Sequence, residues 1–324
     1  MRWIVYGAGA IGGTVGARLH MSGAEVVLIA RGEHAATLQR QGLKFVHPAG
    51  VEQLPITCVT HPSELVPQPT DRVLLAMKTQ HTPAALTDLL QAGFAASPIF
   101  CMQNGVANER MASRLFERVY TTVVNLPALH LEPGVVAAFA EGCGGVLSSG
   151  AYPSGVDSVV YDATGALTAA GFYAEPTPNI MLLKYSKLLA NLGNALQLIL
   201  ADSAEFRDAS RALREEAMQC YSAAHIEFMP LKEFAATAND KFTTAEIPGV
   251  PRTGGSTLQS LVRGAPDVET DYLNGEIVLL GKLYGVATPL NRRVQVLARE
   301  VIEKKCAPND CSWQQVVQTS VLTS

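Results

Sequence analysis

The chain opens with MRWIVYGAGAIGGTVGA, an apolar run followed at once by Gly7, Gly9 and Gly12. In the GxGxxG turn of dinucleotide-binding folds, the first glycine permits a tight turn and the second lets the backbone approach a pyrophosphate. The third lets the helix pack closely on the strand, and the helix N-terminus faces the anion. Because this turn lies between an expected strand and an expected helix, we predict dinucleotide binding by Gly7, Gly9, Ala10, Ile11 and Gly12 rather than an ordinary glycine turn.

Short apolar runs alternate with helical patterns through residues 1–125. The expected strands are WIVYG, EVVLIAR, RVLLAMK, IFCMQNG and VYTTVVNL, and the expected helices cover residues 11–22, 34–41, 83–91 and 106–116. Such alternation is typical of a parallel sheet covered by helices on both faces. ALHLEPGVVAAF and GGVLSSG predict an added hairpin that turns at Pro133-Gly134, followed by a helix over residues 156–170. We therefore expect an α/β Rossmann-type domain over residues 1–179.

From Ile180 onward the patterns are helical, and no further strand is expected. The segments are IMLLKYSKLLANLGNALQLIL, REEAMQCYSAAHIEF, VETDYLNGEIVLLGKLYG and PLNRRVQVLAREVIEKK, the last with Thr288 as its expected N-terminal cap. The sequence therefore predicts an all-α second domain over residues 180–324, carrying substrate-binding and catalytic residues. Its apolar helices are compatible with a homodimer.

Composition narrows the class of partner. A chain of 324 residues with 48% hydrophobic residues is long enough for two cores, and its net charge of −4 disfavours a nucleic-acid partner. There is no polybasic run, no signal-like N-terminus and no apolar run long enough to span a membrane, so we expect a cytoplasmic protein with a small-molecule ligand. The six cysteines lack CxxC spacing, and no histidine accompanies the close pair Cys306 and Cys311, so no metal site is expected.

The second expected strand ends in a cation. Arg31 lies 19 positions after Gly12, where an NAD-binding fold places an acid on the ribose 2′-hydroxyl. A guanidinium pairs with a 2′-phosphate, whereas a carboxylate repels it, so Arg31 favours NADP over NAD. The alternative is a solvated arginine at the start of a helix, paired with Glu33.

The next two expected strands also end in polar residues, Lys78 in KTQ and Asn104 in QNG. Ligands of open parallel sheets bind outside the carboxyl ends of the strands, so the glycines, Arg31, Lys78 and Asn104 are expected at one edge. Lys78 suits a phosphate or a substrate carboxylate, and Asn104 suits the ribose or nicotinamide. Either residue taken alone is also compatible with an ordinary polar strand end.

The helix expected over residues 180–200 carries Lys184, Lys187, Asn191 and Asn194 at spacings of 3, 4 and 3, which puts them on one stripe of an apolar cylinder. Because the stripe is so narrow, we interpret it as a helix edge that lines a cleft and not as a solvent-facing side. A lysine desolvated there has a lowered pKa and can donate a proton. Farther along, Ser256 is a candidate to bind an anionic substrate, and Glu269 is a candidate to position the substrate or a lysine.

These motifs in order resemble the ketopantoate reductase family (2-dehydropantoate 2-reductases). The resemblance covers nearly the whole chain, through GAGAIGG, VVLIARGEHAATLQRQGL, the lysine of LAMKTQ, QNGV, LEPGVV, KLLAN and ETDYLNGEIVLLGKLYGVATPLN. It implies a Rossmann domain joined to a helical domain, with NADPH and a 2-oxo acid meeting between them. It also implies that Lys187 is the catalytic lysine, that Glu269 orients the substrate and aids catalysis, and that Ser256 holds the substrate carboxylate. The other implied contacts are the 2′-phosphate for Arg31, the nicotinamide and substrate side for Lys78 and Asn104, and the substrate for Asn191.

One departure from the family bears on the substrate. The family usually has a second substrate-binding asparagine eight residues after the lysine, where this chain has Ala195, and Asn194 lies about 100° away around a helix. Two alternatives therefore stay open beside ketopantoate reduction. One is a related dehydrogenase acting on another 2-oxo or hydroxy acid. The other is a non-catalytic dinucleotide sensor, which the joint presence of Lys187, Asn191 and Glu269 disfavours.

Overall fold

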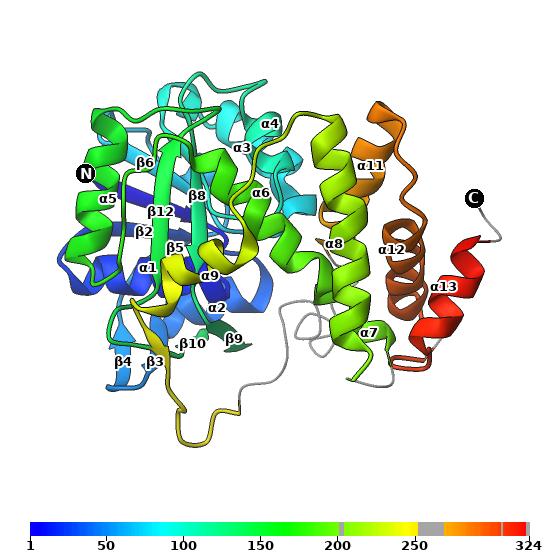
Figure 1. The fold of residues 1–324 in the computed structure, drawn as a ribbon. Helices are drawn as coiled ribbons and strands as arrows, with labels where there is room; N and C mark the ends of the chain where they lie inside the picture. The colour runs from blue at the N-terminus through cyan, green and yellow to red at the C-terminus, as the bar shows by residue number, and fades with distance from the viewer. Residues whose placement is uncertain (201–203, 252–268, 306, 322–324) are drawn as a thin grey trace. The chain divides into compact units, whose positions relative to one another are not determined.

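The computed structural model describes residues 1–200, 204–251, 269–305 and 307–321, and the chain divides into two compact units. The first unit comprises Met1–Leu183 and Lys232–Pro251, and the second comprises Lys184–Leu231 and the described residues after 251. Strands with covering helices make up the first unit, and helices make up the second (Figure 1). This confirms the fold class predicted from the sequence. No helix in the described part of the chain is both long enough and apolar enough to cross a membrane.

The main sheet of the first unit has seven strands in the order β12-β8-β7-β6-β1-β2-β5. All neighbouring pairs are parallel except β12, which pairs antiparallel with β8 at one edge. The strands are β1 (Arg2–Tyr6), β2 (Glu25–Ile29), β5 (Thr57–Val59), β6 (Asp71–Leu75), β7 (Ile99–Cys101), β8 (Val119–Asn125) and β12 (Val146–Ala151). GGVLSSG therefore forms an edge strand of this sheet, and its prediction as part of the added hairpin was wrong.

Strand β1 is buried on both faces, as its unbroken apolar run indicates. Trp3 and Val5 belong to the core on one face of the sheet, and Ile4 and Tyr6 belong to the core on the other. The helices of this unit are α1 (Ala10–Met21), α2 (Gly32–Gln41), α3 (Thr82–Gln91), α4 (Ala107–Ala112) and α5 (Ser158–Ala169), with short 3₁₀ helices η1 (Pro62–Glu64), η2 (Thr79–His81) and η3 (Phe94–Ala96). Helix α4 is shorter than the segment predicted at residues 106–116.

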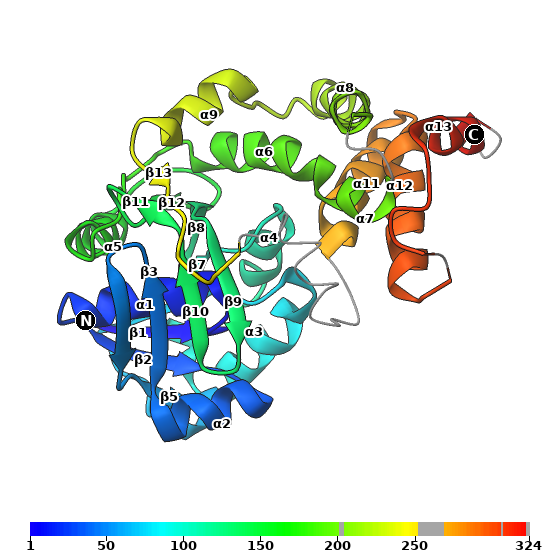
Figure 2. The same cartoon turned by 90° about the horizontal axis from the view of Figure 1, so that it is seen from below.

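A second sheet, in the order β4-β3-β10-β9, packs against α1 on the side away from the main sheet (Figure 2). Its strands are β3 (Leu43–His47), β4 (Gly50–Leu54), β9 (Ala128–Glu132) and β10 (Val135–Ala138). A Cβ on Gly13 would lie 2.8 Å from Val136, and a Cβ on Gly16 would lie 2.8 Å from Leu28 on β2. Small residues therefore let α1 pack between two sheets. The β9–β10 hairpin was predicted, whereas β3 and β4 were not.

The segment Lys232–Pro251 returns to the first unit. It includes β13 (Thr243–Thr244), which pairs antiparallel with β11 (Ala140–Glu141), and Ile247, which is buried against Phe139 and the second sheet. The expectation that no strand follows Ile180 was therefore wrong by this one short strand. Helix α9 (Leu231–Asn239) leads into the segment.

The long helix expected over residues 180–200, which lies in the second unit from Lys184 onward, is broken. It consists of α6 (Ile180–Asn191), a 3₁₀ turn η4 (Leu192–Ala195) and α7 (Leu196–Ile199). The remaining elements are α8 (Phe206–Ala223), η5 (Glu269–Tyr272), α11 (Asn274–Tyr284), α12 (Pro289–Ile302) and α13 (Trp313–Val321). Leu192 lies at the break, and its carbonyl, freed from regular α-helical bonding, accepts from the Asn274 side-chain amide at 3.1 Å.

A buried polar cluster joins these helices. The Glu216 carboxylate of α8 accepts from the backbone N–H groups of Leu290 and Asn291 at 2.8 and 3.0 Å, and the Asn291 amide donates to it at 2.8 Å. Asn291 in turn accepts from Asn274 at 3.0 Å. Glu216 thus caps the N-terminus of α12, a role that the sequence predicted for Thr288, whose side chain makes no capping hydrogen bond.

Candidate active site

Four of the predicted cofactor residues follow neighbouring strands of the main sheet. Gly7 follows β1, Arg31 follows β2, Lys78 follows β6, and Asn104 follows β7. These strands are parallel, so all four residues lie at the carboxyl edge. The order β6-β1-β2 also makes β1 the switch point, because the chain adds strands on one side of β1 and then on the other. This is where open α/β sheets bind their ligands.

The glycine turn leaves room for a ligand at one position only. Gly7 has φ +101°, and a Cβ there would lie 2.6 Å from the backbone nitrogen of Met77, while a Cβ on Gly12 would lie 2.1 Å from the Gly7 carbonyl oxygen. At Gly9, the residue before α1, a Cβ would meet nothing within 4 Å. Gly7 and Gly12 are thus required by packing, whereas Gly9 faces open space at a helix N-terminus, which fits a pyrophosphate.

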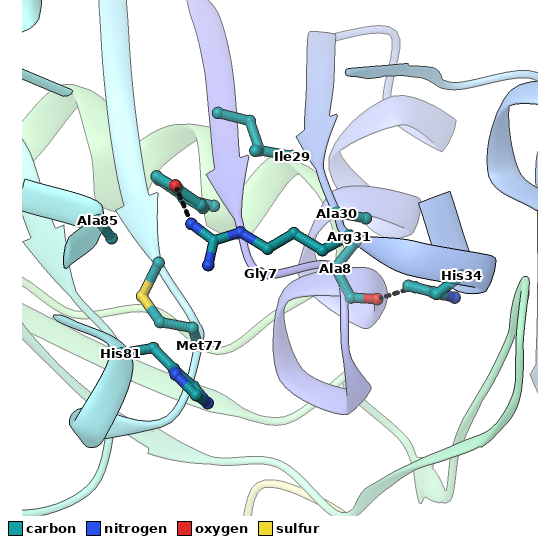
Figure 3. A pocket seen from close by; sticks show the side chains of 10 residues that line it. Gly7, Ala8, Ile29, Ala30, Arg31, His34, Met77, His81 and Ala85 are labelled. Atoms are coloured by element: carbon teal, nitrogen blue, oxygen red, sulfur yellow. Dashed lines mark hydrogen bonds between the residues drawn. The ribbon is translucent and has the colours of Figure 1, made fainter. Parts of the chain in front are cut away.

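A cavity of about 250 Å³ lies beside this turn and is formed by residues of the first unit (Figure 3). Ile29, Ala30, Met77 and Ala85 supply apolar walls, and three basic side chains, Arg31, His34 and His81, also line it. Figure 3 shows Met77 and His81 on one side of the cavity and His34 on the other, with the Arg31 side chain between them. Apolar walls with basic groups beside a glycine turn suit the adenosine end of a dinucleotide.

The hydrogen-bond partners of Arg31 differ from Glu33, the partner considered in the sequence analysis. Its guanidinium donates to the Tyr6 hydroxyl at 2.9 Å and to the Asp88 carboxylate at 3.1 Å. The Tyr6 hydroxyl donates to the same carboxylate oxygen at 2.8 Å, and burial with that hydrogen bond raises the pKa of Tyr6 to about 12. Arg31 thus forms an ion pair with Asp88 on α3, and within the described residues it does not pair with Glu33, the partner in the alternative interpretation.

His34 fixes the glycine turn to the second sheet. Its Nδ1 accepts from the backbone N–H of Gly134 at 2.9 Å, so its Nε2 carries the proton and donates to the Ala8 carbonyl at 2.8 Å. Burial lowers the pKa of His34, which favours this neutral form. His34 was not predicted from the sequence. The only signal for it was its position in the first turn of α2, just after Arg31.

The loops that carry Lys78 and Asn104 are joined by hydrogen bonds. The Asn104 carbonyl accepts from the Asn108 amide at 3.1 Å, and Asn108 also donates to the Thr79 hydroxyl at 3.2 Å. Thr82 donates to Asn108 at 2.8 Å and accepts from Gln103 at 3.0 Å. Lys78 and Asn104 themselves are half-buried at the edge of the sheet. Thr79, Thr82 and Asn108, which hold these two loops together, were not predicted. The sequence analysis considered only Lys78 and Asn104, the residues nearest the strand ends.

The second unit holds the predicted proton donor. On α6, Lys184 is only 2% exposed, and Lys187 is half-buried. The pKa of Lys187 is lowered to about 7, mainly by burial and also by the positive charge of Lys184, while the negative charge of Glu269 on η5 opposes both effects. An amine with a pKa near 7 exchanges a proton readily at neutral pH. The alternative of a solvent-facing stripe does not fit a buried Lys184.

The other predicted substrate residues differ in how they are placed. The Asn191 side-chain nitrogen, one turn after Lys187, is buried and has no hydrogen-bond partner among the described residues, which suits a donor to a ligand. Asn194 is half-buried in η4, and Ala195 beside it is 2% exposed. Ser256 lies outside the described residues.

Family models match both parts of the chain. The model described as "Ketopantoate reductase PanE/ApbA" matches residues 3–150, and the one described as "Ketopantoate reductase PanE/ApbA C terminal" matches residues 179–302. Among similar curated proteins is the 2-dehydropantoate 2-reductase of Pyrococcus horikoshii, 28% identical over 90% of this chain and 94% of that one. The enzyme of the same name from Archaeoglobus fulgidus is 27% identical over 92% and 96% of the two chains.

Solved structures show the same fold. A PanE/ApbA family ketopantoate reductase from Ralstonia eutropha JMP134 is 28% identical and superposes with a TM-score of 0.79, covering 94% of this chain and 99% of its own. D-Mandelate dehydrogenase, in a ternary structure with NADH and anilino(oxo)acetate, has a TM-score of 0.81 over the same shares of the two chains. At 24% identity, that likeness concerns the fold alone.

Proposed function

The chain belongs to the ketopantoate reductase family, whose members are oxidoreductases acting on CH–OH groups, and we propose that it reduces 2-dehydropantoate (ketopantoate) to pantoate with NADPH. The observation that carries the proposal is Lys187, an amine with a pKa near 7 that is influenced by a second lysine and a carboxylate. A dinucleotide-binding protein without catalysis has no need of such a group. The domains we propose are residues 1–179 for the cofactor and residues 180–324 for substrate and catalysis.

The cofactor is held by the glycine turn and the adjoining cavity. Residues 9–12 receive the pyrophosphate at the N-terminus of α1, and Arg31 pairs with the 2′-phosphate that distinguishes NADPH from NADH. Lys78 and Asn104, at the ends of β6 and β7, contact the cofactor farther along the same edge, and Asn104 also contacts the substrate. Bound NADPH supplies the hydride that adds to the C2 carbonyl carbon.

Lys187 supplies the proton. As an ammonium it donates a hydrogen bond to the C2 carbonyl oxygen, which stabilises the negative charge that develops there. It then transfers a proton to that oxygen, becomes the neutral amine and is reprotonated from solvent. A pKa near 7 makes this transfer favourable while leaving much of the lysine charged at neutral pH.

The remaining candidates bind and orient the substrate. The carboxylate of Glu269 keeps Lys187 more basic than burial and Lys184 alone would leave it, and it positions the substrate. The buried Asn191 amide donates to a substrate oxygen, which gives it the partner that it lacks in the structure. Asn194 and Ser256 complete the proposed substrate-binding set.

The test is the loss of NADPH absorbance with purified protein and a panel of 2-oxo acids, ketopantoate included, repeated with NADH. We expect the highest kcat/KM with ketopantoate and NADPH. A different preferred 2-oxo acid would instead identify a related dehydrogenase, the candidate that buried Ala195 favours because no asparagine side chain extends from that position. Tight NADPH binding with no turnover of any acid would identify a sensor. The homodimer and the cytoplasmic location expected from the sequence stay predictions.

A further inference from the structure

A carboxylate lies where the proposed function needs a positive charge. The Asp88 oxygen Oδ2 lies 3.1 Å from the Arg31 guanidinium and 2.8 Å from the Tyr6 hydroxyl, and Arg31 and Tyr6 are 2.9 Å apart. The three groups come from β1, the end of β2 and α3, and Tyr6 and Arg31 both line the cavity beside the glycine turn. The cation expected to receive a 2′-phosphate therefore already has an anionic partner.

The net charge of the cluster formed by Tyr6, Arg31 and Asp88 is close to zero. Arg31 contributes one positive charge, Asp88 one negative charge, and Tyr6 none, since its hydroxyl stays protonated. His61, from the capping turn before η1, lies with Nε2 3.5 Å from the other Asp88 oxygen and adds a charge only when protonated. A 2′-phosphate carries close to two negative charges, so its attraction to Arg31 is opposed by repulsion from Asp88.

Tyr6 reinforces this arrangement. Its single proton is donated to Asp88, and its oxygen accepts from Arg31, so the hydroxyl has no proton to offer a phosphate while the carboxylate is in place. The Asp88 side chain is 22% exposed and that of Arg31 is 57% exposed, so the guanidinium is free to turn toward a ligand while the carboxylate is the more fixed partner.

Resting on the proposed function of Arg31, we propose that Asp88 is a specificity-determining residue that competes with the cofactor's 2′-phosphate for the Arg31 guanidinium. It thereby weakens the preference for NADPH over NADH. NADH carries a neutral 2′-hydroxyl at this position and gains nothing from the release of Arg31. The chain is accordingly expected to use both cofactors, with a moderate preference for NADPH.

The test substitutes Asp88→Asn, which keeps the shape of the side chain and removes its charge. Dissociation constants for NADPH and NADH are measured by fluorescence titration without any oxo acid, at one ionic strength and one pH. We expect the NADPH affinity to rise at least about fivefold and the NADH affinity to change less than about twofold. The matched control is Glu33→Gln, which removes an exposed acid near Arg31 that does not contact it, and it should leave the ratio unchanged.

A second arm separates competition from simple repulsion. In an Arg31→Ala background, Asp88→Asn should raise the ratio of NADPH to NADH affinity much less than in the wild-type background. Only the direct repulsion between Asp88 and the phosphate is then removed, and there is no guanidinium to release. An unchanged ratio in the single variant, an equal gain in the Glu33 control, or a full gain without Arg31 would each overturn the proposal. Wild-type protein that fails to bind NADPH at all would instead overturn the proposed function. A thermal unfolding curve for each variant confirms that the fold is intact.

Discussion

At the scale of single residues, the proposed reduction depends on the charge state of Lys187. In its folded environment the pKa lies near 7 instead of the ordinary value near 10.5, because burial and Lys184 both favour the neutral amine. The acid form, which the reduction needs, is therefore present below pH 7 and is lost above it. The rate of reduction, expressed as kcat/KM, should be level below about pH 7 and fall about tenfold per pH unit above it.

Two substitutions should shift the pH at which kcat/KM begins to fall, in opposite directions. Glu269→Gln removes the negative charge that supports the ammonium, so the fall begins at lower pH, whereas Lys184→Met removes a positive charge and shifts it to higher pH. The measurement is the pH dependence of kcat/KM for each variant, which reports the pKa independently of the absolute rate. Shifts in the same direction would contradict the assignment of the fall to Lys187.

At the scale of elements, the turn between β1 and α1 offers a substitution that separates binding from folding. Gly9→Ala adds a methyl group where, apart from the adjacent residues, no atom of the described chain lies within 4 Å, so stability should change by about 1 kcal/mol or less. That methyl group occupies the space assigned to the pyrophosphate, so NADPH affinity should fall at least about tenfold. Fluorescence titration and thermal unfolding check the two effects.

The control for this variant is Gly165→Ala. This glycine lies exposed within α5, and its Cβ would also meet nothing within 4 Å. It should leave NADPH affinity unchanged and stabilise the helix slightly. Full NADPH affinity in Gly9→Ala would show that the open space at Gly9 is not the cofactor site.

The cap of α12 gives a stability prediction for the second unit. Glu216→Ala leaves two backbone N–H groups and the Asn291 amide without their acceptor, at a cost of about 2–4 kcal/mol. Urea unfolding should show this loss, while Glu215→Ala, an exposed neighbour on α8, should change stability by less than about 0.5 kcal/mol. Equal effects of the two substitutions would show that Glu216 is not the cap.

Helices and strands were predictable where a local pattern of apolar residues was enough to identify them. The short apolar runs that end in Gly7, Arg31, Lys78 and Asn104 identified the parallel strands and their common edge, because they alternate with helical patterns as strands buried on both faces do. β3 and β4 pair with each other as a local hairpin, which escaped prediction because β4 is mostly exposed and carries no apolar run. The other partner of β3 is β10, about 90 positions later in the chain. The break at Leu192 escaped as well, because apolar periodicity continues through it and only the Asn274 contact reveals it.

At the scale of the whole molecule, the sequence predicted two parts but not the return of the chain. Lys232–Pro251 rejoins the first unit because Ile247 packs into a core beside Phe139. No local sequence pattern predicts this contact. The positions of Gly7, Arg31, Lys78 and Asn104 after the strands were predictable, whereas the charge environment of Arg31 was not. Nothing in the sequence pairs Arg31 with Asp88, which lies 57 positions away on another helix.

We propose that NADPH binds at the glycine turn after β1 and that Lys187 on α6 supplies the proton. The most direct measurement is steady-state reduction of ketopantoate by wild type and Lys187→Ala, with NADPH affinity determined for both. We predict that kcat falls about 10²- to 10⁴-fold in the variant while NADPH affinity stays within about twofold. Turnover equal to that of the wild type would contradict the account.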